Sequence, residues 1–396
     1  MNQTPEHNYL FITPYLEEVK RITKACPSLS FKEPTAKPGR FNKSDSLKAL
    51  IMDGHNIAST HALFSLMDAE TLDLLTKSDY HLILDEVMDV VHQVPITKGD
   101  LSDLFRLHLD ADPETHRVSV KQDVPLDYDG KYAEIVGLAR DNRLVYIDGK
   151  ILVWELPREI FGAFKSTHIL TYMFDGQIQK AYFDLHDVGY QYRTVRCRTP
   201  DAPHSDPTKY ELVDLYDGYD EDFRRRLGDL LTIHVDNGTK LNAVGHGRTS
   251  LSLSWYHNKR NGPLKAQLRR NLSNYFRKKH KATADTILWT TFKDQTDSLK
   301  GKGYAGAFEV CNVRATNQYR DRTILAYCIN RYVNTPVQRY LKARGAGTVD
   351  EDRYALSELI QWIMRSALRE DMPVDLYLPS RRMRGLLTAF MGVTER

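Results

Sequence analysis

Two adjacent carboxylates, Asp85 and Glu86, stand at the end of an apolar run in the stretch HLILDEVMDVV. A continuous apolar run such as residues 80–84 is typical of a strand that is buried on both faces of a parallel sheet. The carboxylates would then lie at the carboxyl edge, where open α/β sheets bind ligands. One could hold Mg²⁺ through water while the other activates an attacking water. The alternative is structural: the strand ends at the polar start of a helix, with Asp85 as N-cap.

The elements before this pair predict the sheet that would position it. A β-rich run, YLFIT at residues 9–13, ends at a proline and is followed by apolar residues at helical spacing. A short helix then leads to a second strand at 56–59, a helix over 62–76 and the strand at 80–84. This alternation of strands and helices predicts a parallel, doubly wound sheet.

The second half of the chain repeats the alternation. Residues 198–209 contain three prolines and read as a loop. After them we expect three strands and four helical segments. The strands are at 211–215, 286–291 and 374–378, and the helical segments are at 220–229, 263–281, 323–332 and 355–368. The sequence therefore predicts two α/β domains, 1–190 and 211–396, joined by a linker at 191–210. Within the first domain, Asp148-Gly149 predicts the turn of a β-hairpin.

Composition excludes several classes of protein. With 41% apolar residues the chain of 396 residues is globular rather than disordered. A mean hydropathy of −0.49 and the lack of any run of eighteen apolar residues argue against a membrane-spanning helix. The N-terminal sequence does not resemble a signal peptide. The four cysteines are scattered without a C-x-x-C pair, so neither a zinc site nor a disulfide framework is predicted, and a reducing cytoplasmic location is expected.

Charge is informative in its distribution rather than its total, because the net charge is only +3. Residues 259–281 carry nine lysines and arginines and no acid, with Tyr275 and Phe276 among them. A smaller basic cluster follows at 381–384. Basic clusters beside aromatic residues suit nucleic-acid backbones. The alternative is an ordinary solvated helix face.

Taken in order, several segments resemble the motifs of superfamily 2 helicases of the kind common in bacteriophages and mobile elements. FITPYLEEV is similar to motif Ia and STHALFS to motif Ib. The resemblance implies that Thr13 and Pro14, and likewise Thr60 and His61, contact the nucleic-acid backbone from loops at strand ends.

The central motifs follow the same order. LILDEV resembles motif II, which implies that Asp85 binds Mg²⁺ and that Glu86 is the general base that activates water. ILTYMF stands in the place of motif III, where Thr171 is the only residue that matches. The resemblance implies that Thr171 couples the nucleotide site to the nucleic-acid site. TILWTTFKD, in the second half, resembles motif IV.

Motifs V and VI complete the resemblance. EVCNVRATNQYRDRT stands where motif V is expected, with Asn312, Arg314 and Thr316 as implied nucleic-acid contacts. LIQWIMRSALR resembles motif VI, in which an arginine stabilises charge on the γ-phosphate. Its three candidate residues are four apart and are expected on one helix face. They are Gln361, Arg365 and Arg369.

Two features qualify motif VI. The family usually places its second arginine three residues after the first, so Arg365 matches better than Arg369. The structural alternative is a polar helix face on which Glu358 pairs with Arg365.

The resemblance implies two RecA-like domains in tandem that use ATP and Mg²⁺ on nucleic acid, DNA in preference to RNA, in the host cytoplasm. One required motif is missing: the sequence has no phosphate-binding loop of the form G-x-x-x-x-G-K-[ST]. Without it, triphosphate binding and catalysis are expected to collapse. In this family the strand before that loop is central, so its loss is expected to leave two buried strands with unpaired edges.

Several explanations of the missing loop stay open: a truncation, a downstream start, a split ATPase whose partner chain or segment supplies the missing strand, or a protein that kept the fold and lost the activity. Three functions therefore remain. The first is a helicase or translocase, inactive or incomplete as this chain. The second is a non-catalytic nucleic-acid-binding or assembly factor. The third is a terminase-like packaging ATPase, because Asp85-Glu86 and the later Thr171 fit that class as well.

Overall fold

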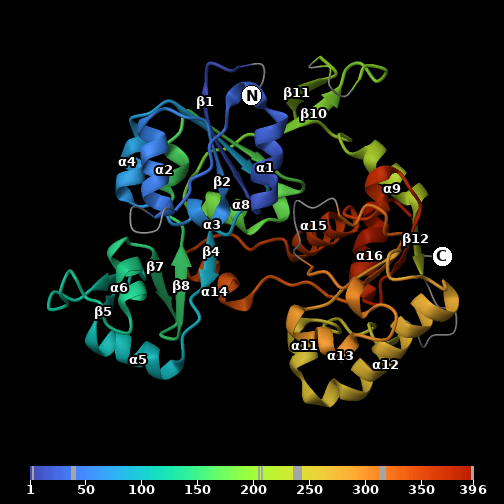
Figure 1. The fold of residues 1–396 in the computed structure, drawn as a ribbon. Helices are drawn as coiled ribbons and strands as arrows, with labels where there is room; N and C mark the ends of the chain where they lie inside the picture. The colour runs from blue at the N-terminus through green and yellow to red at the C-terminus, as the bar shows by residue number, and fades with distance from the viewer. Residues whose placement is uncertain are drawn as a thin grey trace. The chain divides into compact units, whose positions relative to one another are not determined.

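The computed structural model describes residues 1, 4–36, 42–203, 206, 208–234, 243–311 and 318–393. It has the α/β fold predicted from the sequence (Figure 1). The chain divides into two compact units: unit 1 is Met1–Tyr190 with Val333–Val349, and unit 2 is Gln191–Tyr332 with Asp350–Arg396. The segment Val333–Val349 was expected in the second domain, and its packing on unit 1 corrects that boundary.

Unit 1 is built on a parallel sheet with the strand order β2-β1-β3-β9. Its strands are β1 (Asn8–Thr13), β2 (Ile57–Thr60), β3 (Tyr80–Asp85) and β9 (Ser166–Leu170). All three pairings are parallel, which confirms the predicted sheet. The expectation of buried strands with unpaired edges is wrong for the described residues, because β1 lies between β2 and β3, and β3 lies between β1 and β9.

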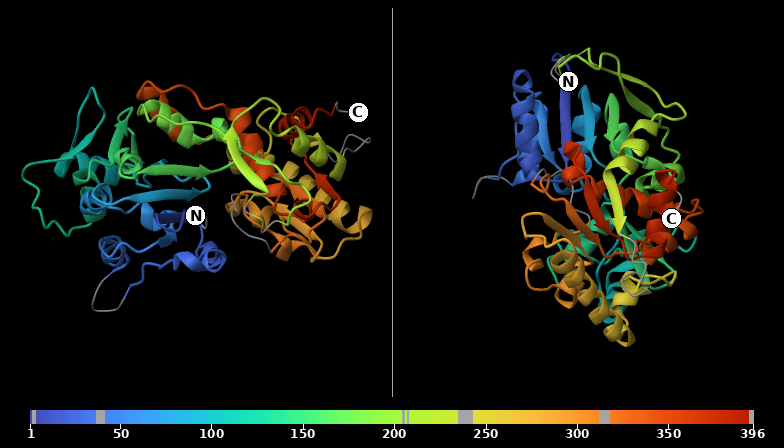
Figure 2. Two further views of the ribbon diagram at one scale, coloured as in Figure 1. Left: turned by 90° about the horizontal axis from the view of Figure 1, so that it is seen from above. Right: turned by 90° about the vertical axis from the view of Figure 1, so that its right-hand side faces the viewer.

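Helices flank this sheet, and the strands run between them in Figure 2. They are α1 (Leu16–Ala25), α2 (Lys43–Met52), α3 (His61–Phe64), α4 (Ala69–Thr76), α7 (Glu159–Gly162) and α8 (Ile178–Leu185). The apolar face of α1, with Val19 and Ile22, packs on Tyr9 and Phe11 of β1. Burying four such side chains contributes on the order of 1.5–3 kcal/mol each.

The helix expected over 62–76 is instead two helices, α3 and α4. The break lies before Asp68, whose carboxylate accepts hydrogen bonds from the backbone N–H and the hydroxyl of Thr71 at 2.9 and 2.7 Å. This N-cap starts a new helix at Ala69. The buried Arg143 donates to the carbonyl oxygens of Ser65, at 2.5 Å, and Met67, and so satisfies the end of α3.

An insertion between β3 and β9 forms a second, antiparallel layer of unit 1. It contains β4 (Val91–Gln93), α5 (Lys98–Leu107), β5 (Leu109–Ala111), β6 (Val118–Val120), α6 (Ala133–Arg140), β7 (Leu144–Ile147) and β8 (Ile151–Glu155). The predicted hairpin is confirmed: β7 and β8 are joined by a turn in which Asp148 and Gly149 both have positive φ, 54° and 62°. That is the conformation such hairpin turns require.

One helix from late in the chain, α14 (Thr335–Ala343), packs on this layer within unit 1. The hydroxyl of Tyr340 donates to the buried carboxylate of Glu155 at 2.6 Å, and Arg117 and His186 approach the same carboxylate at 2.6 and 3.2 Å. Burial alone would raise the pKa of Glu155, but the hydrogen bonds and the charge of Arg117 lower it to about 2. Glu155 is therefore ionised and fixes α14 to β8.

Unit 2 is also built on a parallel sheet, with the order β12-β15-β14-β13. Its strands are β12 (Leu231–His234), β13 (Ile287–Thr290), β14 (Ile324–Tyr327) and β15 (Val374–Tyr377). The helix predicted over 323–332 is wrong, because β14 occupies this stretch. The run is apolar on every side and its last three strand residues are buried, so its spacing could not separate a central strand from a helix.

The predicted linker is only partly a loop. It contributes β10 (Arg193–Cys197), which pairs antiparallel with β11 (Tyr210–Asp214) in a hairpin of unit 2. The strand expected at 211–215 is therefore present but does not join the parallel sheet.

The helices of unit 2 are α9 (Glu221–Leu230), α11 (Leu253–His257), α12 (Gly262–Ser273), α13 (Thr296–Leu299), α15 (Glu351–Ile363) and α16 (Arg381–Phe390). A π-helical segment, Asn274–Lys279, continues α12. Its Tyr275 and Phe276 are fully buried in a core with Trp289 and Tyr304. No described helix of either unit is long and apolar enough to span a bilayer.

Histidines at the amino edge of the unit 1 sheet predict that its stability depends on pH. The rings of His7 and His81 stack at 4.4 Å, and the Ser166 hydroxyl lies between His81 and His168, at 2.7 and 3.0 Å. Burial lowers the pKa of His81, and the charges of His7 and His168 lower it further. Burial and the charged N-terminus lower the pKa of His168.

Because these two pKa values are below those of the unfolded chain, unfolding takes up protons as the pH falls through about 6.5. The melting temperature of unit 1 in calorimetry should therefore drop between about pH 7.5 and pH 5.5. Replacing His81 and His168 with glutamine should reduce this dependence, and the remainder should come from His92, whose pKa is also lowered by burial. His246→Gln, at an exposed histidine of unit 2, should leave it unchanged. An unchanged slope in the double variant would contradict the assignment.

Candidate functional site at the carboxyl edge of the unit 1 sheet

The strand register places the predicted site residues of the first half side by side. Thr13 at the end of β1 is level with Thr60 at the end of β2, and Ile12 is level with Leu84, one residue before Asp85. Asp85 is in turn level with Leu170, which precedes Thr171. Because the four strands are parallel, these residues share one edge, the carboxyl edge that was predicted to carry them.

A hydrogen bond joins two of the predicted residues. The hydroxyl of Thr13, which is fully buried, lies 3.3 Å from a carboxylate oxygen of Asp85 and donates to it. Asp85 itself is half-buried, so it can still meet a ligand from solvent. The alternative that Asp85 caps a helix is wrong, because residues 86–90 form no helix and lead into β4.

Glu86 follows in a left-handed backbone conformation with φ of 71°. This region costs a non-glycine residue roughly 1–2 kcal/mol, and such residues gather at functional sites. Its backbone N–H donates to the carbonyl of Leu170 at 3.0 Å, which ties the turn to β9. No sequence signal predicts this conformation, because glutamate does not favour it.

One further predicted residue of this edge, Thr60, has a structural role. The Thr60 hydroxyl accepts from the backbone N–H of Leu63 at 3.4 Å and caps α3, and His61 is the first residue of that helix. Pro14 directly follows β1, and Thr171 directly follows β9. Helix capping is the alternative that the sequence allows for Thr60. The predicted contacts of these residues with nucleic acid stay predictions.

Sequence reasoning missed a residue that positions this edge. The side-chain oxygen of Gln179, in α8, accepts from the backbone N–H of Met88 at 3.1 Å, and Gln179 is almost fully buried. It thereby anchors the turn that carries Asp85 and Glu86. A glutamine in a short amphipathic helix resembles a surface residue, so only the packing identifies it.

The donor set suits a hard divalent cation. Among the described residues no group of three or more His, Cys, Asp or Glu side chains is arranged to hold a metal ion on its own. Mg²⁺ does not need one, since it keeps several waters and is usually bound by one or two carboxylates together with a phosphate group. The half-buried Asp85, oriented by Thr13, fits that requirement.

The predicted residues of motif VI lie in unit 2, and they do not share a helix. α15 ends at Ile363, so Gln361 is helical, Arg365 lies in the turn after it, and Arg369 is in a 3₁₀ turn. Arg365 is buried and Arg369 is exposed, which corrects the expectation that all three face one way. The turn forms because backbone N–H groups of 365 and 366 bond three residues back, and Ser366 caps the next turn.

The other predictions for the second half have mixed outcomes. Glu358 lies 3.5 Å from Arg331, an ion pair that the sequence did not predict. The strand expected for motif IV is present as β13. Asn312, Arg314 and Thr316 of motif V lie outside the described residues.

Comparisons with known proteins match the C-terminal part of the chain to a family of α/β domains. Residues 226–391 match the model of a family described as the YonV C-terminal Rossmann-like domain. This range holds the whole parallel sheet of unit 2. The structure of S. tokodaii Xpd4 aligns over 100% of this chain and 90% of that chain with a TM-score of 0.44 and 13% identity, a similarity too weak to carry an argument.

A relative matches over almost the full length. The SPbeta prophage-derived uncharacterized protein YonV of Bacillus subtilis (strain 168) is 35% identical over 395 residues, which cover 98% of this chain and 93% of the relative. Identity at that level over nearly the whole of both sequences, with the C-terminal domain matched independently, means that the chain belongs to the YonV family.

Proposed function

We propose that this protein is a helicase-like factor that binds a Mg²⁺–nucleotide at the carboxyl edge of the unit 1 sheet and acts on nucleic acid. The observation that carries the proposal is the hydrogen bond from buried Thr13 to Asp85, directly beside Glu86 in its left-handed turn. It supports a preoriented carboxylate pair at the place where α/β sheets bind ligands.

The residues divide the work by chemistry. Asp85 supplies the carboxylate oxygen for the cation, and Thr13 holds that carboxylate in one orientation. Glu86 is the group that accepts a proton from an attacking water. The cation, when bound, neutralises charge on the phosphate groups.

Phosphate binding is the weak part of this site. The sequence contains no G-x-x-x-x-G-K-[ST] run, and the first turn of α1, which follows β1, carries Glu17 and Glu18. Acidic side chains at a helix N-terminus repel phosphate instead of attracting it. We therefore expect the chain to bind the cation, to hold the nucleotide weakly and only through that cation, and to hydrolyse ATP at the background rate unless another segment supplies the phosphate loop.

Titration with Mn²⁺ in place of Mg²⁺, followed by the electron paramagnetic resonance signal of the free ion, tests the site. With ADP present, Thr13→Val should weaken Mn²⁺ binding by roughly 10–100-fold, and Asp85→Asn, which removes the ligand itself, should weaken it further. Asp79→Asn is the matched control, because Asp79 precedes the same strand at its opposite end and pairs with Lys165. Equal affinities for Asp85→Asn and Asp79→Asn would sink the proposal.

A second candidate is a nucleic-acid-binding factor without catalysis. The acidic start of α1 and the missing loop favour it. Glu86→Gln separates the two candidates: in the phage host it should abolish the activity of a motor and leave that of a binding factor intact.

A further inference from the structure

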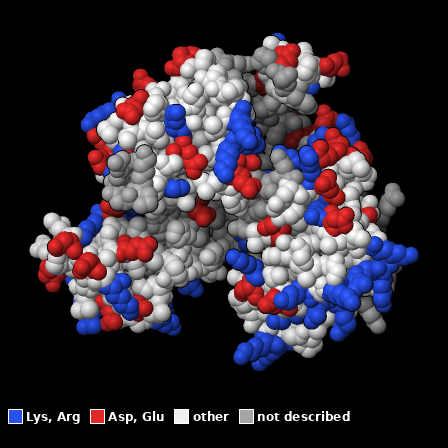
Figure 3. Space-filling model, viewed as in Figure 1, with Lys and Arg blue, Asp and Glu red and all other residues white. Residues whose placement is uncertain are grey.

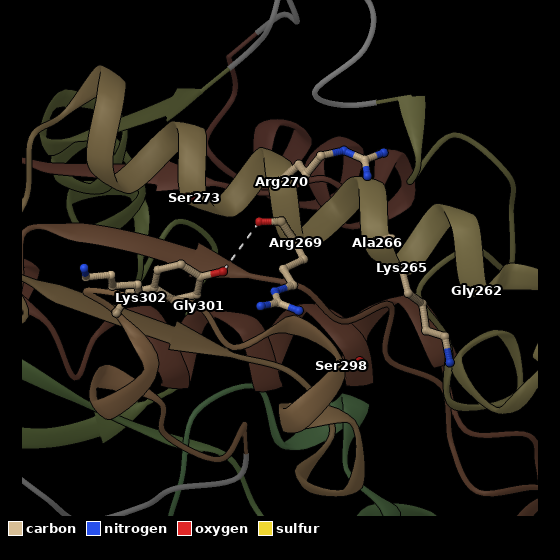
Figure 4. A pocket seen from close by; sticks show the side chains of 10 residues that line it. Gly262, Lys265, Ala266, Arg269, Arg270, Ser273, Ser298, Gly301 and Lys302 are labelled. Carbon is tan, nitrogen blue, oxygen red and sulfur yellow. Dashed lines mark hydrogen bonds between the residues drawn. The ribbon is translucent and has the colours of Figure 1, made fainter.

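A pocket on the surface of unit 2 is lined by basic side chains. It has a volume of about 530 Å³ and lies between α12 and the segment around Ser298 and Gly301 (Figure 4). Lys265, Arg269 and Arg270 come from α12, and Lys302 comes from the facing segment. Arg269 points from the helix towards that segment in Figure 4, whereas Lys265, one helical turn earlier, donates to the carbonyl of Tyr256 at 3.1 Å. The described lining contains no carboxylate.

The positive charge around this pocket is not neutralised by carboxylates of the described residues. Lys and Arg gather on the face of unit 2 over α12 in Figure 3. Among the described residues, no carboxylate lies within ion-pairing distance of the four basic side chains of the pocket, whereas Lys300, two residues before Lys302, pairs with Asp297 at 2.7 Å. Within the described part of the chain, Lys265 and Arg270 donate only to uncharged groups, the carbonyl of Tyr256 at 3.1 Å and the side-chain oxygen of Gln267 at 2.7 Å. A concentrated charge without a carboxylate partner attracts an anionic ligand.

The pocket is preformed rather than a chance contact of loops. Tyr304, which is fully buried, donates through its hydroxyl to the carbonyls of Leu299 at 2.7 Å and Arg269 at 3.5 Å, so it joins the two walls. A side chain at Gly301 would collide with the Tyr304 ring, with 2.6 Å between its Cβ and the hydroxyl oxygen. Arg277 also donates to the Lys302 carbonyl at 3.4 Å and holds that segment on the helix.

The two aromatic residues of the basic segment 259–281 restrict the class of ligand that the pocket can bind. Tyr275 and Phe276, which in the sequence suggested base stacking, are buried in the core of unit 2 by the π-helical segment. They cannot serve as a stacking platform, which sequence-tolerant single-strand binders use. Tyr304, the aromatic residue in the described lining, is fully buried as well. The described part of this surface therefore offers charges for phosphates and no exposed aromatic ring for bases.

We infer that this pocket and the basic face of α12 form a phosphodiester-backbone site, which binds nucleic acid through its phosphates and without regard to base sequence. Nothing in the motif-like segments assigns this site. The inference rests on the proposed function in taking nucleic acid as the ligand, but it needs neither the cation nor the nucleotide.

Fluorescence anisotropy of labelled duplex and single-stranded DNA of mixed sequence, in EDTA and without nucleotide, tests the inference. The triple variant Lys265→Gln, Arg269→Gln, Lys302→Gln should bind about tenfold more weakly or worse, and its salt slope between about 50 and 200 mM should fall by roughly three. Two mixed sequences should bind the wild type equally.

The matched control removes the same charge from another helix of unit 2. It is a triple variant of α9, where each of three successive arginines pairs with an acid: Arg224→Gln, Arg225→Gln and Arg226→Gln. The DNA affinity of this control should fall by less than about twofold, because salt screens the change in net charge at a distance from the bound DNA. An equal loss of DNA affinity in the two triple variants would show that the pocket is not the binding site.

The remaining outcomes are also decisive. If the wild type ignores DNA and RNA but binds vesicles of anionic lipid, the ligand class is wrong. If DNA binds and the pocket variant is unaffected, the pocket is wrong while the proposed function stands. If the pocket variant loses DNA affinity as predicted and Asp85→Asn leaves Mn²⁺ binding intact, the inference stands and the proposed function is wrong.

Discussion

Replacing Gly245 with alanine should unfold unit 2 at a much lower denaturant concentration than the wild type needs. A Cβ atom at Gly245 would lie 1.8 Å from the carbonyl oxygen of Pro379 and 2.8 Å from the backbone nitrogen of Ser380. These are backbone atoms, so no side chain can move aside. We expect a loss of about 3 kcal/mol or more in the free energy of unfolding, the upper range for overpacking.

The backbone at Pro379 is held in place by its neighbours. Arg384, which is buried, donates to the carbonyls of Leu378 at 2.9 Å and Pro379 at 3.1 Å. The buried Ser380 caps α16, and the N–H of Arg381 donates to the Gly245 carbonyl at 3.0 Å. Displacing Pro379 would therefore break several buried hydrogen bonds, each costly to leave unmade.

Gly385→Ala is the matched control, since Gly385 lies within α16 and a Cβ there meets nothing within 4 Å. It should stabilise unit 2 by about 0.5–1 kcal/mol through helix propensity. Three of the four tryptophans lie in unit 2, so intrinsic fluorescence in a urea titration reports mainly on that unit. Similar midpoints for Gly245→Ala and the wild type would refute the close approach.

Replacing Glu155 with alanine should be the most damaging change at a polar residue of unit 1. Arg117 and the buried His186 would both lose the carboxylate that they contact. Tyr340 would lose the acceptor of its hydroxyl. Removing one member of a buried charged network costs about 3–5 kcal/mol, because the remaining charge stays desolvated. Hydrogen exchange with mass spectrometry should show lost protection both in β8 and in residues 333–349.

Two variants on α14 calibrate that result. Tyr340→Phe removes a single hydrogen bond to a charged group and should cost about 1.5–3 kcal/mol, with the protection loss centred on α14. Arg339→Ala breaks an exposed pair with Asp148, 3.6 Å apart, and should change stability by less than about 1 kcal/mol. If Glu155→Ala were no worse than Arg339→Ala, the carboxylate would not anchor the helix.

The sequence predicts the parallel sheet of unit 1 because its strands carry local signals. The runs at β1 and β3 are apolar and bounded by a proline or by carboxylates, and the Asp148-Gly149 turn has its own chemistry. From parallel pairing it also follows that Thr13 and Asp85 share an edge, although the hydrogen bond between them depends on the register.

Features that depend on distant packing could not be predicted. β14 is a central strand because both of its neighbours are strands, while its apolar sequence fits a helix equally well. Similarly, the helix expected to hold both Gln361 and Arg365 ends between them. The return of α14 to unit 1 rests on Tyr340 meeting Glu155, two residues 185 positions apart. Burial of Tyr275 follows from a π-helical segment that has no clear sequence signature.

Locating the cation directly tests the central claim. Crystals of the protein soaked with Mn²⁺ and ADP should give an anomalous scattering peak beside Asp85 at the carboxyl edge of the unit 1 sheet, and crystals of Asp85→Asn should lose that peak. A manganese peak elsewhere in the chain, with none beside Asp85, would contradict the account.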